Sequence, residues 1–122
     1  MKKQYLFLAL FIIAALALLN FSKKSVDAPS ALDNFAQCLA GRGFTMYGAD
    51  WCPHCQNEKR AFGASFRFVT YVECPDNPKL CLEKGIEGYP TWILADGERL
   101  VGEQGIERLS QKSGCLLPQG NQ

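Results

Sequence analysis

Two cysteines separated by two residues, Cys52 and Cys55, are the part of this sequence best suited to chemistry. The run 44–49 before them is typical of a buried strand, and the run 56–66 after them predicts a helix. A helix N-terminus stabilises a thiolate, because unpaired N–H groups and the positive end of the helix dipole lie there. We therefore expect Cys52 to be the nucleophile and Cys55 to be the resolving thiol of a thiol–disulfide exchange.

The residues around the pair suit this position. Pro53 fits the first helical turn, where its missing N–H costs no hydrogen bond. His54 is the only histidine, and we expect it to tune the thiolate of Cys52. As a general base it would need an orienting partner, and the sequence shows none. Trp51 is interpreted either as part of a surface that faces the substrate or as a core residue.

Two other uses of a Cys-x-x-Cys pair fit less well. A zinc site needs four ligands, and the remaining candidates, Cys74, Cys81 and His54, are not spaced as in a zinc ribbon. An inert disulfide would not explain the strand and helix that flank the pair. We predict no metal site, and the sequence contains no separate cofactor motif.

Size and composition limit the function further. The chain has 122 residues, and about 90 of them remain for one small domain after an apolar N-terminal segment. Six cysteines in so short a chain indicate an oxidising compartment. The 13 basic and 12 acidic residues are interspersed, so the sequence predicts no nucleic-acid partner.

The chain divides into five predicted segments. Residues 1–4 are a short basic start, and residues 5–21 are almost wholly apolar. As a helix this run is about 26 Å long, against about 30 Å for a hydrocarbon core. It is either an uncleaved membrane anchor, which we favour, or a secretory signal. The cysteine usage places the domain on the extracytoplasmic side, periplasmic, luminal or at the outer cell surface. Residues 22–29 are interpreted as a tether, 30–115 as the domain and 116–122 as a flexible tail.

Periodicity and turn signals predict the elements of this domain. They are a helix at 31–40 capped by Ser30, a strand at 44–49, a helix at 56–66, a strand at 68–74, a short helix at 79–84, strands at 92–94 and 98–101, and a helix at 106–112. A helical crossover makes the first two strands parallel, and Asp96-Gly97 predicts a hairpin. The pattern indicates an α/β fold, with a small mixed sheet flanked by helices.

The Cys-x-x-Cys motif followed by Tyr89-Pro90-Thr91 resembles the thioredoxin superfamily. That resemblance implies a thioredoxin-like fold in which a cis proline, here Pro90, lies against the cysteine pair. It also implies that the backbone of Tyr89 or Thr91 pairs with an extended substrate strand. The dipeptide between the cysteines is similar to that of strongly oxidising periplasmic disulfide oxidases.

A more specific resemblance extends over most of the predicted domain. It rests on Phe35-Ala36-Gln37-Cys38-Leu39, Met46-Tyr47-Gly48-Ala49, Tyr71-Val72-Glu73-Cys74, Cys81, Tyr89-Pro90-Thr91-Trp92 and Gly114-Cys115. These segments are similar to the thioredoxin-like domain fused to bacterial homologues of vitamin K epoxide reductase. The four-helix quinone-reducing part of those fusions has no counterpart here. We therefore expect a separate membrane partner, a quinone-linked thiol oxidase resembling vitamin K epoxide reductase, to reoxidise the pair.

One position departs from ordinary thioredoxins, which carry a buried acidic residue six positions before the first cysteine. This position is Met46 here, so proton transfer at Cys55 must use another group or water.

The four remaining cysteines allow three pairings. Cys74 and Cys81 flank a turn and a short helix, while Cys38 and Cys115 end the first and last helices of the domain. We expect Cys74–Cys81 and Cys38–Cys115 as structural disulfides. The alternative is that one of these pairs passes electrons to a membrane partner, with Cys38 the candidate nearer the anchor in sequence.

These observations predict a membrane-tethered thiol–disulfide oxidoreductase that donates disulfides to the thiols of exported proteins. One alternative is a reductase or isomerase that uses the same cysteines in the other direction. Another is an assembly chaperone that binds copper through Cys52 and Cys55 without net oxidation. The residues Pro53 and His54 favour the oxidase, whereas tight Cu(I) binding that either cysteine replacement abolishes would favour the chaperone.

Overall fold

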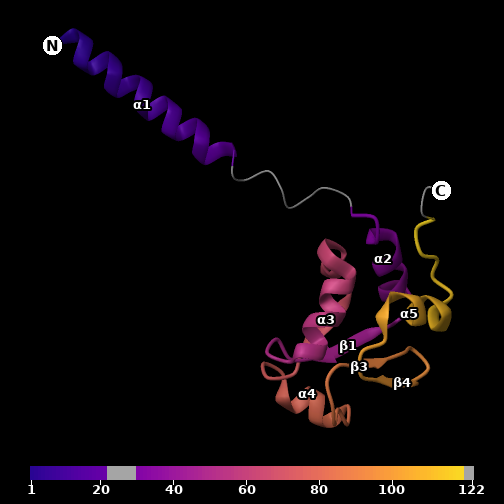
Figure 1. Ribbon diagram of the computed structural model, residues 1–122. Helices are drawn as coiled ribbons and strands as arrows, with labels where there is room; N and C mark the ends of the chain where they lie inside the picture. The colour runs from indigo at the N-terminus through magenta and orange to yellow at the C-terminus, as the bar shows by residue number, and fades with distance from the viewer. Residues whose placement is uncertain (22–29, 120–122) are drawn as a thin grey trace.

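The computed structural model describes residues 1–21 and 30–119, and its side chains are described for 1–16 and 30–119 (Figure 1). The elements are α1 (Lys2–Phe21), α2 (Asp33–Gly41), β1 (Thr45–Gly48), α3 (Pro53–Phe62), the 3-10 helix η1 (Gly63–Phe68), β2 (Thr70–Glu73), α4 (Pro78–Glu83), β3 (Thr91–Ile93), β4 (Arg99–Val101) and α5 (Gly105–Ser113). The predicted tether, 22–29, and the end of the predicted tail, 120–122, lie outside the described residues.

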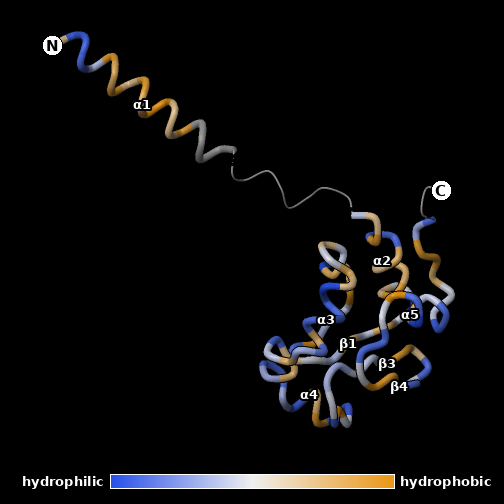
Figure 2. Tube along the Cα trace, in the orientation of Figure 1, coloured by the Kyte–Doolittle hydropathy of each residue, from blue (hydrophilic) through white to orange (hydrophobic). Residues whose placement is uncertain are grey.

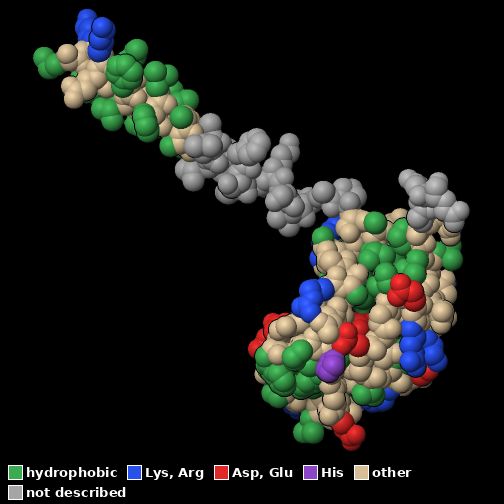
Figure 3. Space-filling view, viewed as in Figure 1, with side chains coloured by type: hydrophobic (Ala, Val, Ile, Leu, Met, Phe, Trp, Pro, Cys, Tyr) green, Lys and Arg blue, Asp and Glu red, His purple; other side chains and the backbone are tan. Residues whose placement is uncertain are grey.

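The N-terminal helix α1 carries apolar side chains that the domain does not cover. Tyr5, Phe7 and Phe11 are 70%, 68% and 80% exposed, and the helix forms an apolar run in Figures 2 and 3. Crossing a bilayer takes about 20 largely apolar residues. Within the described residues, no helix combines the length and the apolarity needed to span a membrane. The transmembrane helix expected from the sequence is therefore not found there.

The domain is organised around a mixed sheet, which within the described residues has the strand order β2-β1-β3-β4. Strand β1 is parallel to β2, with Thr45 opposite Thr70, and α3 with η1 forms the crossover between them. Strand β3 is antiparallel to β1, with Met46 opposite Trp92. Strand β4 returns antiparallel to β3 after the turn at Gly97. The parallel pair β1–β2 and the hairpin β3–β4 were predicted from the sequence, whereas the antiparallel pairing of β3 with β1 was not.

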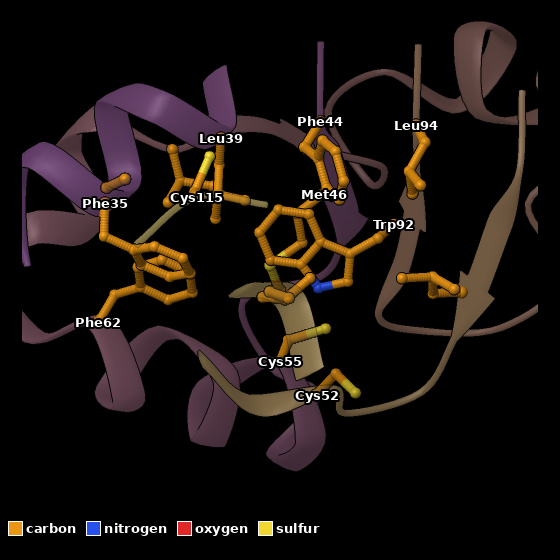
Figure 4. Close-up of a cluster of buried hydrophobic side chains, with 14 of the residues drawn as sticks. Phe35, Leu39, Phe44, Met46, Cys52, Cys55, Phe62, Trp92, Leu94 and Cys115 are labelled. Carbon is orange, nitrogen blue, oxygen red and sulfur yellow. The ribbon is translucent and has the colours of Figure 1, made fainter. Parts of the chain in front are cut away.

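The alternation of β1 separates two clusters of buried side chains. Met46 faces the larger one, in which the Phe62 ring lies 5.8 Å from Phe35 and 6.1 Å from Trp92 (Figure 4). Helices α2, α3 and α5 all contribute buried residues to this cluster. Tyr47 faces the smaller cluster, which includes Cys81 of α4. Helices thus cover both faces of the sheet, and Trp92 is a fully buried core residue.

Helices α2 and α3 depart most from their predicted boundaries. Helix α2 begins at Asp33, and instead of a Ser30 side-chain cap, the Ser30 backbone N–H donates to the Asp33 carboxylate at 3.0 Å. The same carboxylate accepts from Ser65 at 2.8 Å and pairs with Arg67 at 2.7 Å, which ties α2 to η1. Helix α3 ends at Phe62, and the chain continues as η1 where the sequence pattern predicted one longer helix.

Two disulfides join described cysteines in the pairing expected from the sequence. Cys38–Cys115 connects α2 to the chain beyond α5 and spans 77 residues. Cys74–Cys81 spans 7 residues and connects the end of β2 to α4. The first bond fastens the two ends of the domain, and the second closes a local loop. Cys52 and Cys55 are both free thiols.

Candidate active site

The free cysteine pair lies where β1 is followed by α3. Cys52 has extended backbone angles and is the N-cap of α3, and the N–H of Gln56 donates to its carbonyl at 3.0 Å. Pro53 occupies the first helical turn, as predicted. Cys55 lies one turn further along the helix. The residues of the pair are only 7% and 0% exposed, so Cys52 is less accessible than its place at a helix N-terminus suggested.

The cover over Cys52 comes from the segment that precedes β3. The peptide bond between Tyr89 and Pro90 is cis, and Pro90 is fully buried. The Cys52 thiol donates to the Tyr89 carbonyl at a sulfur–oxygen distance of 3.8 Å. Thr91 is paired in the sheet on both sides, with Tyr47 of β1 and Val101 of β4. The backbone of Thr91 is therefore not free to pair with a substrate strand, and Tyr89, which lies before the start of β3, is the remaining candidate.

Trp51 lies on the surface beside the pair. Its side chain is 68% exposed, and its ring contacts Tyr89 edge to face at a centroid distance of 6.0 Å. Of the two interpretations of Trp51 that the sequence left open, the structure therefore favours the surface position. The two aromatic rings form an apolar rim next to Cys52.

His54 has a partner that the sequence did not reveal. Its Nδ1 lies 2.6 Å from Oε2 of Glu103, and the Asn57 side-chain amide donates to the same oxygen at 3.2 Å. Figure 3 shows the histidine on the surface next to acidic side chains. The hydrogen bond from His54, and then that from Asn57, lower the pKa of Glu103. Glu103 comes from the loop between β4 and α5, far along the chain, so no local signal pointed to it.

A buried carboxylate fixes the loop that carries this partner. Glu58 of α3 is 1% exposed and accepts from the backbone N–H groups of Gln104 at 2.9 Å and Gly105 at 3.2 Å. Burial raises the pKa of Glu58. Because these N–H groups begin α5, Glu58 satisfies donors that have no partner within that helix. Glu58 thereby attaches the Glu103 loop to the helix that carries the cysteine pair.

Cys55 is enclosed by the end of β1. A Cβ atom at Gly48 would lie 2.7 Å from the Cys55 sulfur, closer than real atoms pack, so only glycine leaves room for this thiol. Burial raises the pKa of Cys55 to about 11. The thiol therefore keeps its proton at neutral pH unless a neighbouring group removes it. Gly48 is a site residue that we did not single out, although a glycine at the end of the strand before the motif is its visible signal.

A polar network lies on the β2 side of Cys55. The Tyr71 hydroxyl donates to the Glu73 carboxylate, whose other oxygen accepts from the backbone N–H of Asp50 at 3.0 Å. Lys59 of α3 pairs with the Asp50 carboxylate, and its ammonium lies 4.0 Å from the centroid of the Tyr71 ring. Burial, and then the hydrogen bond to Glu73, raise the pKa of Tyr71. No pattern in the sequence indicated that these four residues would meet.

Within the described residues, no group of three or more His, Cys, Asp or Glu side chains is placed to hold a metal ion. The donors that a zinc site would have recruited are engaged otherwise: Cys74 and Cys81 with each other, and His54 with Glu103.

Comparisons with known proteins point to the same chemistry as the cysteine pair. No family model matches the chain. It is 40% identical over 107 residues to "Thiol-disulfide oxidoreductase LTO1" of Arabidopsis thaliana, a match that covers 80% of this chain and 28% of that protein. It is 31% identical over 98 residues to "Thioredoxin domain-containing protein 5 homolog" of Drosophila melanogaster, covering 69% of this chain and 23% of that protein. It is 37% identical over 76 residues to "Protein disulfide isomerase-like 2-2" of Oryza sativa subsp. japonica, covering 52% and 20%. The chain thus spans less than a third of the length of these relatives.

Among solved structures, oxidised glutaredoxin 2 from Chlamydomonas reinhardtii is similar over 70% of this chain and 95% of its own, with a TM-score of 0.40 and 22% identity. Two free thiols one helical turn apart at a strand–helix junction, one of them donating to the carbonyl of the cis Tyr89–Pro90 peptide, suit thiol–disulfide exchange. The chain is therefore similar, over less than a third of their length, to proteins named as a thiol–disulfide oxidoreductase and a protein disulfide isomerase-like protein.

Proposed function

We propose that the protein is a disulfide oxidase, which donates the disulfide of its Cys52–Cys55 pair to the thiols of exported proteins. The observation that carries this proposal is the position of Cys52 at the N-cap of α3, next to a His54 held by Glu103. A helix N-terminus presents unpaired N–H groups and the positive end of the helix dipole, which stabilise negative charge placed there. A stabilised reduced form makes a cysteine pair a strong oxidant.

The reaction takes two exchange steps. A substrate thiolate attacks the Cys52 sulfur of the oxidised pair, the bond to Cys55 breaks, and Cys55 takes up a proton. A second substrate thiolate then attacks the substrate sulfur of this mixed disulfide, and Cys52 leaves as a thiolate. The substrate loses two electrons and gains a disulfide, and the pair gains the two electrons.

The surface beside Cys52 supports binding of an extended peptide. Tyr89 precedes the first residue of β3, and the rim formed by Trp51 and Tyr89 is apolar. A strand added next to the Tyr89 backbone would bring its cysteine to the Cys52 sulfur, and the rim would contact the neighbouring side chains.

The proposed cycle includes a membrane partner that reoxidises the pair, a quinone-linked thiol oxidase resembling vitamin K epoxide reductase. The resemblance of the domain to those fusions supports it. An extracytoplasmic location is supported by the disulfides Cys38–Cys115 and Cys74–Cys81, because such bonds persist in oxidising compartments. In membranes depleted of quinone, alkylation with a maleimide should find the pair reduced, and a pair that stays oxidised would count against this partner.

Attachment to the membrane through residues 5–21 is part of the same proposal. The exposed apolar side chains of α1 support it, because a contiguous apolar surface of this kind needs a cover. The full chain should stay with membranes washed in alkaline carbonate, whereas a chain that begins at Ser30 should be released. Release of both chains would refute the attachment.

The decisive test of the oxidase direction is the reduction potential of the pair. The protein is equilibrated with mixtures of glutathione and glutathione disulfide, and the oxidised fraction of Cys52 and Cys55 is read by mass spectrometry. We expect a value well above that of thioredoxin, about −270 mV. A value near −270 mV, that of thioredoxin, would instead support the reductase. A difference of 30 mV between two potentials corresponds to about 1.4 kcal/mol for two electrons. Cys52→Ser, which cannot form the disulfide, is the control.

A further inference from the structure

The exchange proposed above obliges Cys55 to lose and regain a proton in every cycle, and this inference rests on that function. Cys55 is fully buried, and its pKa of about 11 keeps the thiol protonated at neutral pH. The position where thioredoxins carry a buried acid holds Met46, which is fully buried and cannot accept a proton. A different group must therefore connect Cys55 to solvent.

Gly48 identifies which side chain is near enough. The point where a Gly48 Cβ would stand lies 2.7 Å from the Cys55 sulfur, 3.3 Å from Cε2 of Tyr71 and 3.4 Å from the Tyr71 hydroxyl oxygen. Both groups therefore crowd the same side of β1, and glycine leaves the space between them open. Because β1 and β2 are parallel neighbours with Met46 opposite Tyr71 and Gly48 opposite Glu73, Tyr71 lies two residues from the partner of Gly48 and on the same face of the sheet.

Tyr71 is also joined to the surface. Its hydroxyl donates to Glu73, a partly exposed residue whose carboxylate is fixed by the N–H of Asp50. Lys59 contacts the Tyr71 ring and pairs with Asp50, and its positive charge acts to lower the pKa of Cys55. Tyr71, on the open side of Gly48 that Cys55 also borders, is thus hydrogen-bonded to a partly exposed carboxylate.

We propose that Tyr71 and Glu73 form the proton path of the resolving thiol Cys55, with Lys59 and Asp50 as positioning residues.

The transfer balances in both directions. When Cys55 attacks the Cys52 sulfur of a mixed disulfide, its S–H proton passes to the Tyr71 oxygen, and the Tyr71 hydroxyl proton passes to the Glu73 carboxylate. The bond between Cys52 and the leaving thiolate breaks as the Cys52–Cys55 bond forms, and Glu73 then releases its proton to water. When a substrate thiolate opens the pair, the same protons move back to the Cys55 thiolate.

Glu58, a buried acid on α3, is a rival candidate for the proton path. Glu58 lies one turn after Cys55, but its oxygens accept from the N–H groups of Gln104 and Gly105. The other charged or titratable groups near Cys55 are Cys52, Lys59 and Tyr71, with Asp50 and Glu73 behind them. Among the described residues, the Tyr71–Glu73 pair leads from the side of the thiol to the surface without giving up a contact that holds the fold.

The test separates the two chemical steps. The reduced full chain is mixed with glutathione disulfide, quenched in acid at set times, and analysed by mass spectrometry. Formation of the Cys52–glutathione mixed disulfide reports the first step. Its loss, as Cys55 displaces glutathione, reports the second step. The variants are Tyr71→Phe and Glu73→Gln, and the controls are Tyr47→Phe, a buried tyrosine that faces the smaller cluster, and Glu58→Gln.

We expect Tyr71→Phe to slow the second step about 100-fold, the scale of general acid–base catalysis, and to leave the first step unchanged. Its second-step rate should then rise about tenfold per pH unit toward the pKa of Cys55, about 11, while the wild-type rate rises less steeply. Glu73→Gln should share the defect, and the controls should not.

Either of two results would overturn the proposal. One is a second step as fast in Tyr71→Phe and Glu73→Gln as in the Tyr47→Phe control. The other is an equal decrease in the rates of the first and second steps in these variants. A slower second step in Glu58→Gln alone would assign the path to Glu58 instead. Circular dichroism shows whether each variant folds. If Tyr71→Phe does not fold, Glu73→Gln still tests the proposal. A low reduction potential would refute the oxidase direction without changing the second step, so the two failures are distinguishable.

Discussion

Removal of the Cys38–Cys115 bond should cost far more stability than removal of Cys74–Cys81, and the structure gives the size of the difference. A disulfide limits the conformations of the unfolded chain, and the limit grows with the length of the closed loop. The two bonds span 77 and 7 residues. The chain-entropy relation then gives about 4.5 kcal/mol for the long loop and about 2.4 kcal/mol for the short one. The first value alone is comparable to the whole stability of a marginal domain, about 5 kcal/mol.

Double alanine variants of each pair provide a matched comparison. Cys115, Cys74 and Cys81 are all at most 5% exposed and Cys38 is partly buried, so alanine at either pair leaves only small cavities. Urea denaturation followed by circular dichroism gives the free energy of unfolding of each variant. With a urea dependence of about 2 kcal/mol per molar, the difference of about 2 kcal/mol corresponds to a midpoint about 1 M lower for the variant without Cys38–Cys115.

The reasoning fails if the variant without Cys74–Cys81 is equally or more destabilised. That outcome would mean that native contacts around α4, and not the entropy of the unfolded chain, determine the contribution of each bond. Under reducing conditions that spare the fold of the wild-type protein, Cys74–Cys81 should be reduced before Cys38–Cys115.

Three further changes test the site. Gly48→Ala places a Cβ 2.7 Å from the Cys55 sulfur, so it should destabilise the domain by about 1–3 kcal/mol and slow closure of the pair. The control is Gly41→Ala, whose Cβ would meet no described atom within 4 Å. Equal free energies of unfolding of the two variants would refute the packing argument. Glu103→Gln removes the acceptor that holds His54 and should lower the reduction potential of the pair by about 15–30 mV; an unchanged or higher potential in glutathione equilibration would show that this contact does not tune Cys52. Because burial raises the pKa of Glu58, the native state binds more protons than the unfolded state above pH about 4.3, and the stability that Glu58 contributes falls as pH rises through its native pKa. Glu58→Gln should lack this decline in urea titrations at several pH values, and parallel pH profiles of the two proteins would contradict it.

Features that depend on neighbouring residues could be predicted from the sequence alone. Cys52 and Cys55 mark a helix start because chain spacing brings them onto one turn after a strand, and Pro53 adds a local backbone preference. The parallel pairing of β1 with β2 follows from the helical crossover between them. The pairing of Cys74 with Cys81 follows from a short loop, in which the two thiols cannot be far apart.

Features that depend on contacts between distant segments were decided only by the tertiary structure. The exposed position of Trp51 results from packing, which local patterns do not encode. Glu103 meets His54 because Glu58 fixes the start of α5 against α3. The same holds for the surroundings of Cys55. The parallel register of β1 and β2 brings Tyr71 and Glu73 beside Gly48, and no periodicity in the sequence states which side chains two neighbouring strands will bring together. The sequence by itself thus determined the reactive pair and the order of the elements, whereas side-chain packing across the sheet decided which groups surround each thiol.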